Sequence, residues 1–236
     1  MGRHFEVRAA AMAATAKAKS AIYMRASKEI YAAAKKGIPD PASNLALRSA
    51  IEKYRKSCPR DVIDRAIEKA KGGDSVAYIE GRYEFFGPGG SLIIVDTMSD
   101  NGNRALTEVR TIVTRKGGKP GSVLYNFEMK SLIDLKGDEK ARDAIEEGLI
   151  LGDVDVTSVT YEDGYVEITA APTDLEKAKD VLKGLGYDDF ETAEVTFVPN
   201  DYVTLEGDDL EHFKKMMAEL NECEDVQNVY HNVENA

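Results

Sequence analysis

The chain has 236 residues, of which 43% are hydrophobic and 31% are charged, as is typical of a folded soluble protein of two or three domains. These proportions exclude collagen-like, low-complexity and wholly disordered chains, and no apolar run approaches the roughly 18 residues that a membrane-spanning helix needs. Two cysteines far apart in sequence exclude a disulfide-dense secreted scaffold, and we expect a reduced, cytoplasmic compartment.

The first third of the chain is typical of three helices. Neither Pro nor Gly occurs from residue 9 to residue 36, where strong helix formers predominate, and Gly37 followed by Pro39 ends this segment. Ser43 or Asn44 can cap a second helix, and Pro59 opens a third that ends at Gly72. The predicted helices are residues 9–36, 45 to about 56, and 59–71.

After residue 76 the pattern changes to one that favours strands. Residues 78–86 and 91–98 are rich in β-formers, and Gly87-Pro88-Gly89-Gly90 between them indicates a hairpin. Asp100 and Asn101 can cap a helix over about 103–115, and residues 123–127 are predicted to form the next strand.

Residues 130–198 follow the order of a ferredoxin-like βαββαβ unit. The predicted strands are 132–135, 156–161, 165–170 and 193–198, with a tight turn at Asp163-Gly164. The predicted helices are 139–147, ending at Gly148, and 174–185, capped by Thr173. A further strand, helix and strand are predicted at 202–205, 208–220 and 226–231.

These elements predict an α+β protein in which a three-helix domain precedes two ferredoxin-like α/β domains, one inserted in the other. Residues 76–128 supply strands with too few helices to cover them, and the last segment supplies a missing helix. The expected domains are 1–75, basic and helical; 76–129 with 199–236, α+β; and 130–198, inserted.

No pattern in the chain points to catalysis. The motifs of serine hydrolases, zinc proteases, phosphate-binding loops and dinucleotide-binding folds do not occur. Gly87-Pro88-Gly89-Gly90 joins two strands and is interpreted as a turn, while Cys58 and Cys223 lack a nearby histidine. We therefore expect no catalytic residue, no cofactor and no metal site.

The net charge of −11 conceals two oppositely charged regions. Residues 1–73 hold 16 Lys and Arg against 7 Asp and Glu, whereas residues 74–236 hold 15 against 35. On a helical wheel Lys17, Lys28 and Lys35 share one face of the first helix, where each could neutralise a phosphate. A merely solvated face, or attraction between the two regions, remains the alternative. The candidate nucleic-acid-binding residues are Arg3, Arg8, Lys17, Lys19, Arg25, Lys28, Lys35 and Lys36.

Six motifs, in order, resemble the YebC family, whose members include bacterial regulators and a mitochondrial translational activator. They are residues 66–73 (AIEKAKGG), 83–90 (YEFFGPGG), 99–104 (SDNGNR), 108–110 (EVR), 121–127 (GSVLYNF) and 225–232 (DVQNVYHN). The resemblance implies three domains and a nonenzymatic role in gene expression. It departs at the N-terminal arm, where many members have Gly-His-Ser-Lys-Trp and this chain has Gly2-Arg3-His4-Phe5-Glu6.

The middle motif of the family contributes secondary nucleic-acid-binding candidates, Asn103, Arg104 and Arg110. The alternative for the two arginines is intramolecular pairing with Asp100 or Glu108.

The resemblance and the charge together favour a translation factor that contacts ribosomal or transfer RNA on the ribosome through its basic N-terminal helices. The alternative is a DNA-binding transcriptional regulator, although no compact helix-turn-helix is apparent. A protein–protein adaptor is a third possibility. We expect a monomer with no membrane partner.

Overall fold

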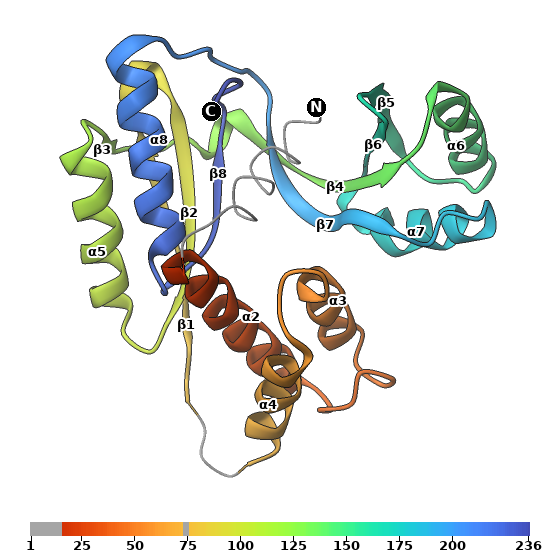
Figure 1. Ribbon diagram of the computed structural model, residues 1–236, viewed down its shortest axis with the longest axis horizontal. Coiled ribbons are helices and arrows are strands. Elements are labelled where there is room, and N and C mark those ends of the chain that lie inside the picture. Colours follow the sequence, from red (N-terminus) through yellow and green to blue (C-terminus); the bar gives the residue numbers. More distant parts are fainter. Residues whose placement is uncertain (1–15, 73–75) are drawn as a thin grey trace. The chain divides into compact units, whose positions relative to one another are not determined.

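The computed structural model describes residues 16–72 and 76–236, and for Lys17 it describes the backbone alone. Arg3, Arg8 and the predicted helix before residue 16 lie outside the described residues. The chain divides into two compact units, one formed by residues 127–198 and the other by the described part of 11–126 together with 199–236. The predicted fold class is confirmed, with N-terminal helices followed by two four-stranded sheets (Figure 1). The boundary near residue 75 stays a prediction.

Three helices open the larger unit: α2 (Ala16–Lys36), α3 (Leu45–Tyr54) and α4 (Arg60–Lys71). Helix α2 packs on both α3 and α4 around a core that includes Ile30, Leu47 and Ile63. Asn44 caps α3, because its side-chain oxygen accepts a hydrogen bond from the N–H of Leu47 at 3.0 Å. Its amide nitrogen donates to Ala33 O and Ile38 O, so one side chain joins the end of α2 to the start of α3.

The sheet of the larger unit has the order β3-β1-β2-β8. Its strands are β1 (Ile79–Phe86), β2 (Leu92–Ser99), the short edge strand β3 (Lys119–Pro120) and β8 (Val226–His231). Helices α5 (Gly102–Arg115) and α8 (Gly207–Glu222) pack on it around a core that includes Ile93, Val109 and Phe213. The predicted turn between β1 and β2 is the 3-10 turn η1 (Pro88–Gly90), where Gly89 and Gly90 take positive φ angles.

The inserted unit is a ferredoxin-like sheet of order β5-β6-β4-β7. Its core includes Ile133, Ile145 and Leu182. In the Asp163-Gly164 turn both residues have positive φ, which favours a tight β-hairpin. In chain order its elements are β4 (Phe127–Lys136), α6 (Glu139–Leu151), β5 (Val156–Glu162), β6 (Tyr165–Ala170), the 3-10 turn η3 (Pro172–Asp174), α7 (Leu175–Gly184) and β7 (Phe190–Pro199).

Two segments that were predicted to be strands are not strands in the structure. The strand predicted at 123–127 is instead the 3-10 turn η2 (Leu124–Asn126), after which β4 begins. The carboxylate of Glu84, on strand β1, accepts hydrogen bonds from the N–H groups of Val123 and Leu124. Local sequence propensity does not reveal this long-range contact. Residues 202–205 form only an isolated bridge, from Val203 to Val233.

Two predicted helix boundaries are also wrong. Helix α6 continues past Gly148, whose missing side chain leaves room for Leu185. Helix α7 begins after Asp174 without a side-chain cap, so Thr173 is not its capping residue.

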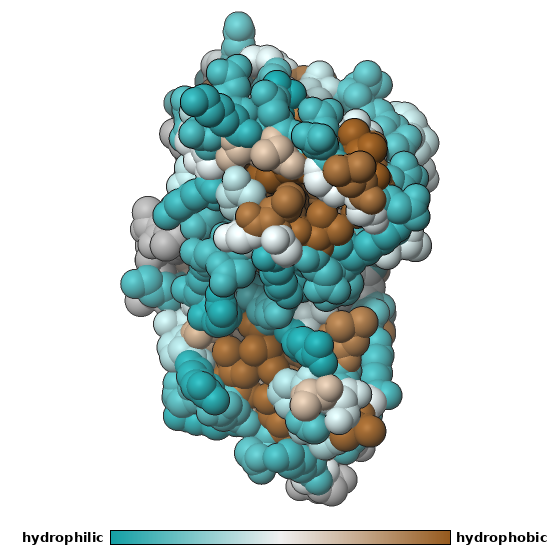
Figure 2. All heavy atoms as spheres, turned by 90° about the vertical axis from the view of Figure 1, so that its right-hand side faces the viewer, coloured by the Kyte–Doolittle hydropathy of each residue, from teal (hydrophilic) through white to brown (hydrophobic). Residues whose placement is uncertain are grey.

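None of the described helices is long and apolar enough to cross a membrane. On the face viewed in Figure 2, hydrophobic residues gather in separate patches surrounded by hydrophilic side chains. Within the described ranges, Leu151 at 79% and Tyr125 at 74% are the most exposed of the large hydrophobic side chains.

Candidate nucleic-acid interface

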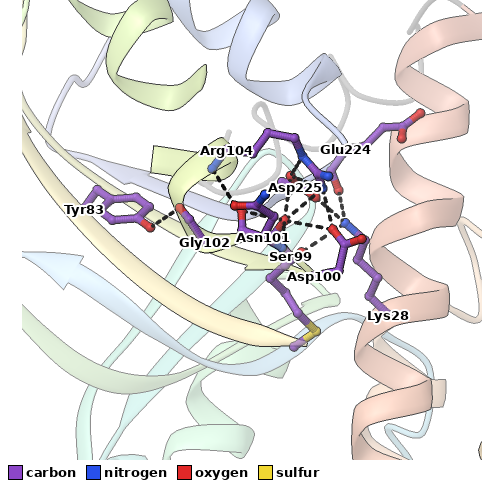
Figure 3. Close-up of polar contacts among 10 residues, drawn as sticks. Lys28, Tyr83, Ser99, Asp100, Asn101, Gly102, Arg104, Glu224 and Asp225 are labelled. Carbon is purple, nitrogen blue, oxygen red and sulfur yellow. Dashed lines mark hydrogen bonds and ion pairs between the residues drawn. The ribbon is translucent and has the colours of Figure 1, made fainter. Parts of the chain in front are cut away.

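Lys28 does not lie on a solvent-facing stripe, so the predicted placement of this lysine is wrong. The residue is only 6% exposed. Its Nζ donates to Met98 O at 3.0 Å, to Glu224 O at 2.9 Å and to Asp225 Oδ1 at 2.7 Å (Figure 3). The prediction assumed that only one face of α2 packs, whereas the opposite face also contacts α8 and the ends of β2 and β8. Lys28 is therefore a structural cation, unavailable to a phosphate.

Asp225 is the centre of this polar network, which we call the Asp225 network: Lys28, Ser99, Asp100, Arg104 and Asp225. The Oδ2 of Asp225 accepts from Ser99 Oγ at 2.9 Å and from Arg104 Nη2 at 2.9 Å. Arg104 Nη2 also donates to Asp100 Oδ1 at 2.7 Å, which confirms the intramolecular alternative for this arginine.

The charge state of Asp225 follows from two opposing effects. Burial raises the pKa of this carboxyl group, whereas hydrogen bonds from Lys28, Arg104 and Ser99 to the ionised form lower it. The lowering is the larger effect, so the net shift of the pKa is downward. Hydrogen bonds to Asp225 and Asp100 raise the pKa of Arg104. Asp225 is thus ionised near neutral pH, and its buried ion pair with Lys28 joins α2 to the sheet.

Arg25 also has a structural partner. It donates to the carbonyl oxygens of Leu220 and Asn221, at 3.3 and 2.7 Å, which lie in the last turn of α8. A cation at a helix C-terminus interacts favourably with the unsatisfied carbonyl groups there. Burial lowers the pKa of Arg25, and within the described residues its Nε has no hydrogen-bond partner. Arg25 and Lys28 therefore anchor α2 rather than presenting charge to a ligand.

The predicted cations that remain exposed are Lys19 near the start of α2 and Lys35 and Lys36 at its end. Lys35 Nζ approaches Ala70 O and Gly72 O at 3.4 and 3.3 Å, which places the C-terminal ends of α2 and α4 beside each other. Lys36 pairs with Glu80 at 2.8 Å, with side chains 73% and 61% exposed.

The adjacency of these helix ends brings together residues that the sequence prediction missed. Lys69 and Lys71 on the last turn of α4 are exposed, and we call Lys35, Lys36, Lys69 and Lys71 the lysine cluster. Lys69 Nζ lies 5.6 Å from the ring centroid of Tyr31, and Lys71 pairs with exposed Glu68. The sequence feature that could have identified Lys69 and Lys71 is the AIEKAKGG motif at 66–73, which contains both lysines.

The other secondary candidates, Asn103 and Arg110, lie exposed on α5. Arg110 makes no ion pair with Glu108 or any other residue of the described chain. The structure does not bring either side chain into the lysine cluster.

Neither cysteine has the character of a nucleophile. Burial, with a smaller contribution from the Asp61 charge, raises the pKa of Cys58 to about 11. Burial likewise raises the pKa of Cys223. Over residues 16–72 and 76–236, no group of three or more His, Cys, Asp or Glu side chains is arranged to hold a metal ion.

Comparison with known proteins places these features in a family. Residues 3–73 match the model of the TACO1/YebC protein N-terminal domain, and residues 78–233 match that of the TACO1/YebC second and third domain. The fold is similar to the crystal structure of a conserved hypothetical protein from Aquifex aeolicus, with 31% sequence identity and a TM-score of 0.77. That alignment covers 91% of this chain and 90% of the other. The two matched domain models, which together cover nearly the whole chain, show that this protein belongs to the TACO1/YebC family.

Proposed function

We propose that this protein is a nonenzymatic regulator of gene expression that binds RNA on the ribosome through the lysine cluster. The observation that carries the proposal is the contact between the C-terminal ends of α2 and α4, which gathers four exposed lysines in the basic part of the chain. Membership of the TACO1/YebC family supports the regulatory part of this proposal.

The ion pairs of the lysine cluster are weak enough for an RNA phosphate to replace their carboxylates. Lys36–Glu80 and Lys71–Glu68 are exposed pairs, and such pairs contribute little to stability because water and salt screen them. A phosphate can replace either carboxylate at small cost, and each neutralised phosphate releases counterions. The four lysines outnumber these two carboxylates, so a net positive charge remains even when both pairs form.

The acidic charge of the rest of the chain favours an RNA that contacts the protein over a small surface. Residues 74–236 carry 35 acidic against 15 basic side chains, and this charge repels a long duplex lying across the molecule. The cluster lies at two helix ends, a position suited to backbone contacts that fix orientation rather than to a recognition helix lying in a major groove.

Co-sedimentation with ribosomes on sucrose gradients tests the proposal. The variant replaces Lys35, Lys36, Lys69 and Lys71 by Gln; its control replaces four other exposed lysines, Lys140, Lys183, Lys214 and Lys215, by Gln. Wild type and control should comigrate with ribosomes at moderate salt, while the variant should remain at the top of the gradient. Thermal melting of both variants checks that each is folded.

Equal comigration of the two variants would remove the lysine cluster from the interface. Absence of wild-type protein from the ribosomal fractions at both low and moderate salt would overturn the ribosomal role. A parallel gel-shift titration with duplex DNA then distinguishes a DNA regulator, for which tight binding lost in the cluster variant is the expected result.

A further inference from the structure

A second positively charged segment lies inside the acidic part of the chain. Between Glu108 and Glu128 there is no acidic residue, although residues 74–236 as a whole are strongly acidic. The segment contains four cations, Arg110, Arg115, Lys116 and Lys119. It runs through the second half of α5, the edge strand β3 and the turn η2.

These cations are only partly neutralised by the rest of the unit. Arg115 and Lys116 share a single carboxylate, that of Glu219 on α8, at 3.2 and 2.9 Å. Lys119 is exposed on the edge strand, and its Nζ lies 5.9 Å from the ring centroid of Phe86. Two carboxylates of the described chain contact the segment, Glu219 and the Glu84 that binds the turn η2, so its four cations leave it with a net positive charge.

Tyr125 lies in the same segment and is presented to solvent on a firmly held turn. Its side chain is 74% exposed, whereas Val123 is fully buried and Asn126 is 6% exposed. Glu84 Oε2 accepts hydrogen bonds from the N–H groups of Val123 and Leu124, at 2.6 and 2.8 Å. On the other side of Tyr125, Asn126 Nδ2 donates to Asp201 O, and Asn126 O accepts from the N–H of Asn200.

The local chemistry separates Tyr125 from the other highly exposed apolar residue. Leu151 lies on α6 one and two turns after Glu147 and Asp143, whose charges repel a polyanion. Tyr125 instead lies in a chain segment that contains four cations and no acidic residue, and an aromatic face together with positive charge is the combination that binds single-stranded nucleic acid. Its turn is already ordered, so binding would cost little further conformational entropy.

We propose that Tyr125 stacks on an unpaired RNA base while Lys119, whose strand pairs with β1 at Phe86, contacts a backbone phosphate of the same RNA strand. This second contact rests on the proposed function, since it supposes that RNA is the ligand, but it lies outside the lysine cluster and uses different chemistry. The lysine cluster neutralises backbone charge, whereas Tyr125 selects a flexible, unpaired stretch whose bases can be splayed out.

The absence of tryptophan from the sequence allows a direct test. Tyr125→Trp introduces a single indole at the proposed platform, and Tyr161→Trp introduces one at an exposed tyrosine on β5 as the control. Each protein is titrated with a fluorescein-labelled single-stranded oligoadenylate, and anisotropy of the label measures binding independently of the indole. The indole at 125 should be quenched in parallel with binding, and the indole at 161 should not.

Loss of the ring should weaken binding without unfolding the protein. Tyr125→Ala should lower the affinity for the oligonucleotide by about 5- to 150-fold, and Tyr125→Phe should retain wild-type affinity because it keeps the aromatic face. Binding without quenching at 125, or unchanged affinity of Tyr125→Ala, would overturn the stacking contact and leave the proposed function intact. Absence of any wild-type binding to the oligonucleotide would overturn the stacking contact, and the proposed function would fall with it only if the protein is also absent from the ribosomal fractions.

Discussion

Two lysines on the same helix make ion pairs of almost equal length with opposite consequences. Lys28, near the middle of α2, lies 2.7 Å from Asp225, and the two side chains are 7% and 6% exposed. Lys36, at the end of α2, lies 2.8 Å from Glu80, with side chains 73% and 61% exposed. The distance between the charged atoms does not decide what a lysine does; its burial does, because burial removes both the competing water and the access of a ligand.

Removing the buried lysine should produce the largest effect. Lys28→Met leaves Asp225 buried without its closest cation, and the free energy of unfolding should fall by about 3–5 kcal/mol. Urea unfolding at pH 7 measures the loss, with wild type as the reference. A loss below about 1 kcal/mol, the range of exposed pairs, would mean that the buried pair is no more important than the exposed one.

The stability that the Lys28–Asp225 pair contributes should depend on pH. The pKa of Asp225 is lowered in the folded protein, so its ionised form contributes stability above the unfolded-state pKa of about 3.9. This contribution is lost as the pH falls from there through the lowered folded-state value. Asp225→Asn cannot titrate, and the stability gap between it and wild type should therefore be constant above about pH 5 and narrow in more acidic solution. Unfolding midpoints between pH 3 and pH 7 would show this, and a gap independent of pH would contradict it.

Arg104 provides an intermediate case. Its side chain is 52% exposed and contacts both the buried Asp225 and the exposed Asp100. Arg104→Gln should lower the melting temperature by less than Lys28→Met and by more than Lys36→Met, since Lys28 still neutralises Asp225. A melting temperature equal to that of wild type would show that Lys28 alone holds the network together.

The exposed lysine should have the smallest effect on stability. Lys36→Met should change the free energy of unfolding by less than about 1 kcal/mol, while lowering RNA affinity through the loss of one cation of the lysine cluster. The dependence of log affinity on log salt for a single-stranded RNA should become shallower by about 0.7. An unaltered salt dependence would mean that Lys36 contacts no phosphate.

Sequence alone established most of the secondary structure, because its signals are local. Asn44 caps α3 and the Asp163-Gly164 turn closes its hairpin as expected, since each depends on a few consecutive residues. The prediction failed at residues 123–127, where a strand was expected. The cause is the Glu84 carboxylate, which lies about 40 residues away in sequence and binds two backbone N–H groups of this segment.

The charge of the first 73 residues was also plain from the sequence, but which cations are available was decided only by tertiary structure. A helical wheel places Lys17, Lys28 and Lys35 on one face. It cannot indicate that α8 and the ends of β2 and β8 pack against the centre of that face. The same packing of α2 that buries Lys28 against Asp225 leaves its far end beside α4, where Lys69 and Lys71 join Lys35 and Lys36. Sequence determines how many charges a helix carries, whereas contacts between distant segments determine which of them remain in water, because desolvation depends on every neighbour in space.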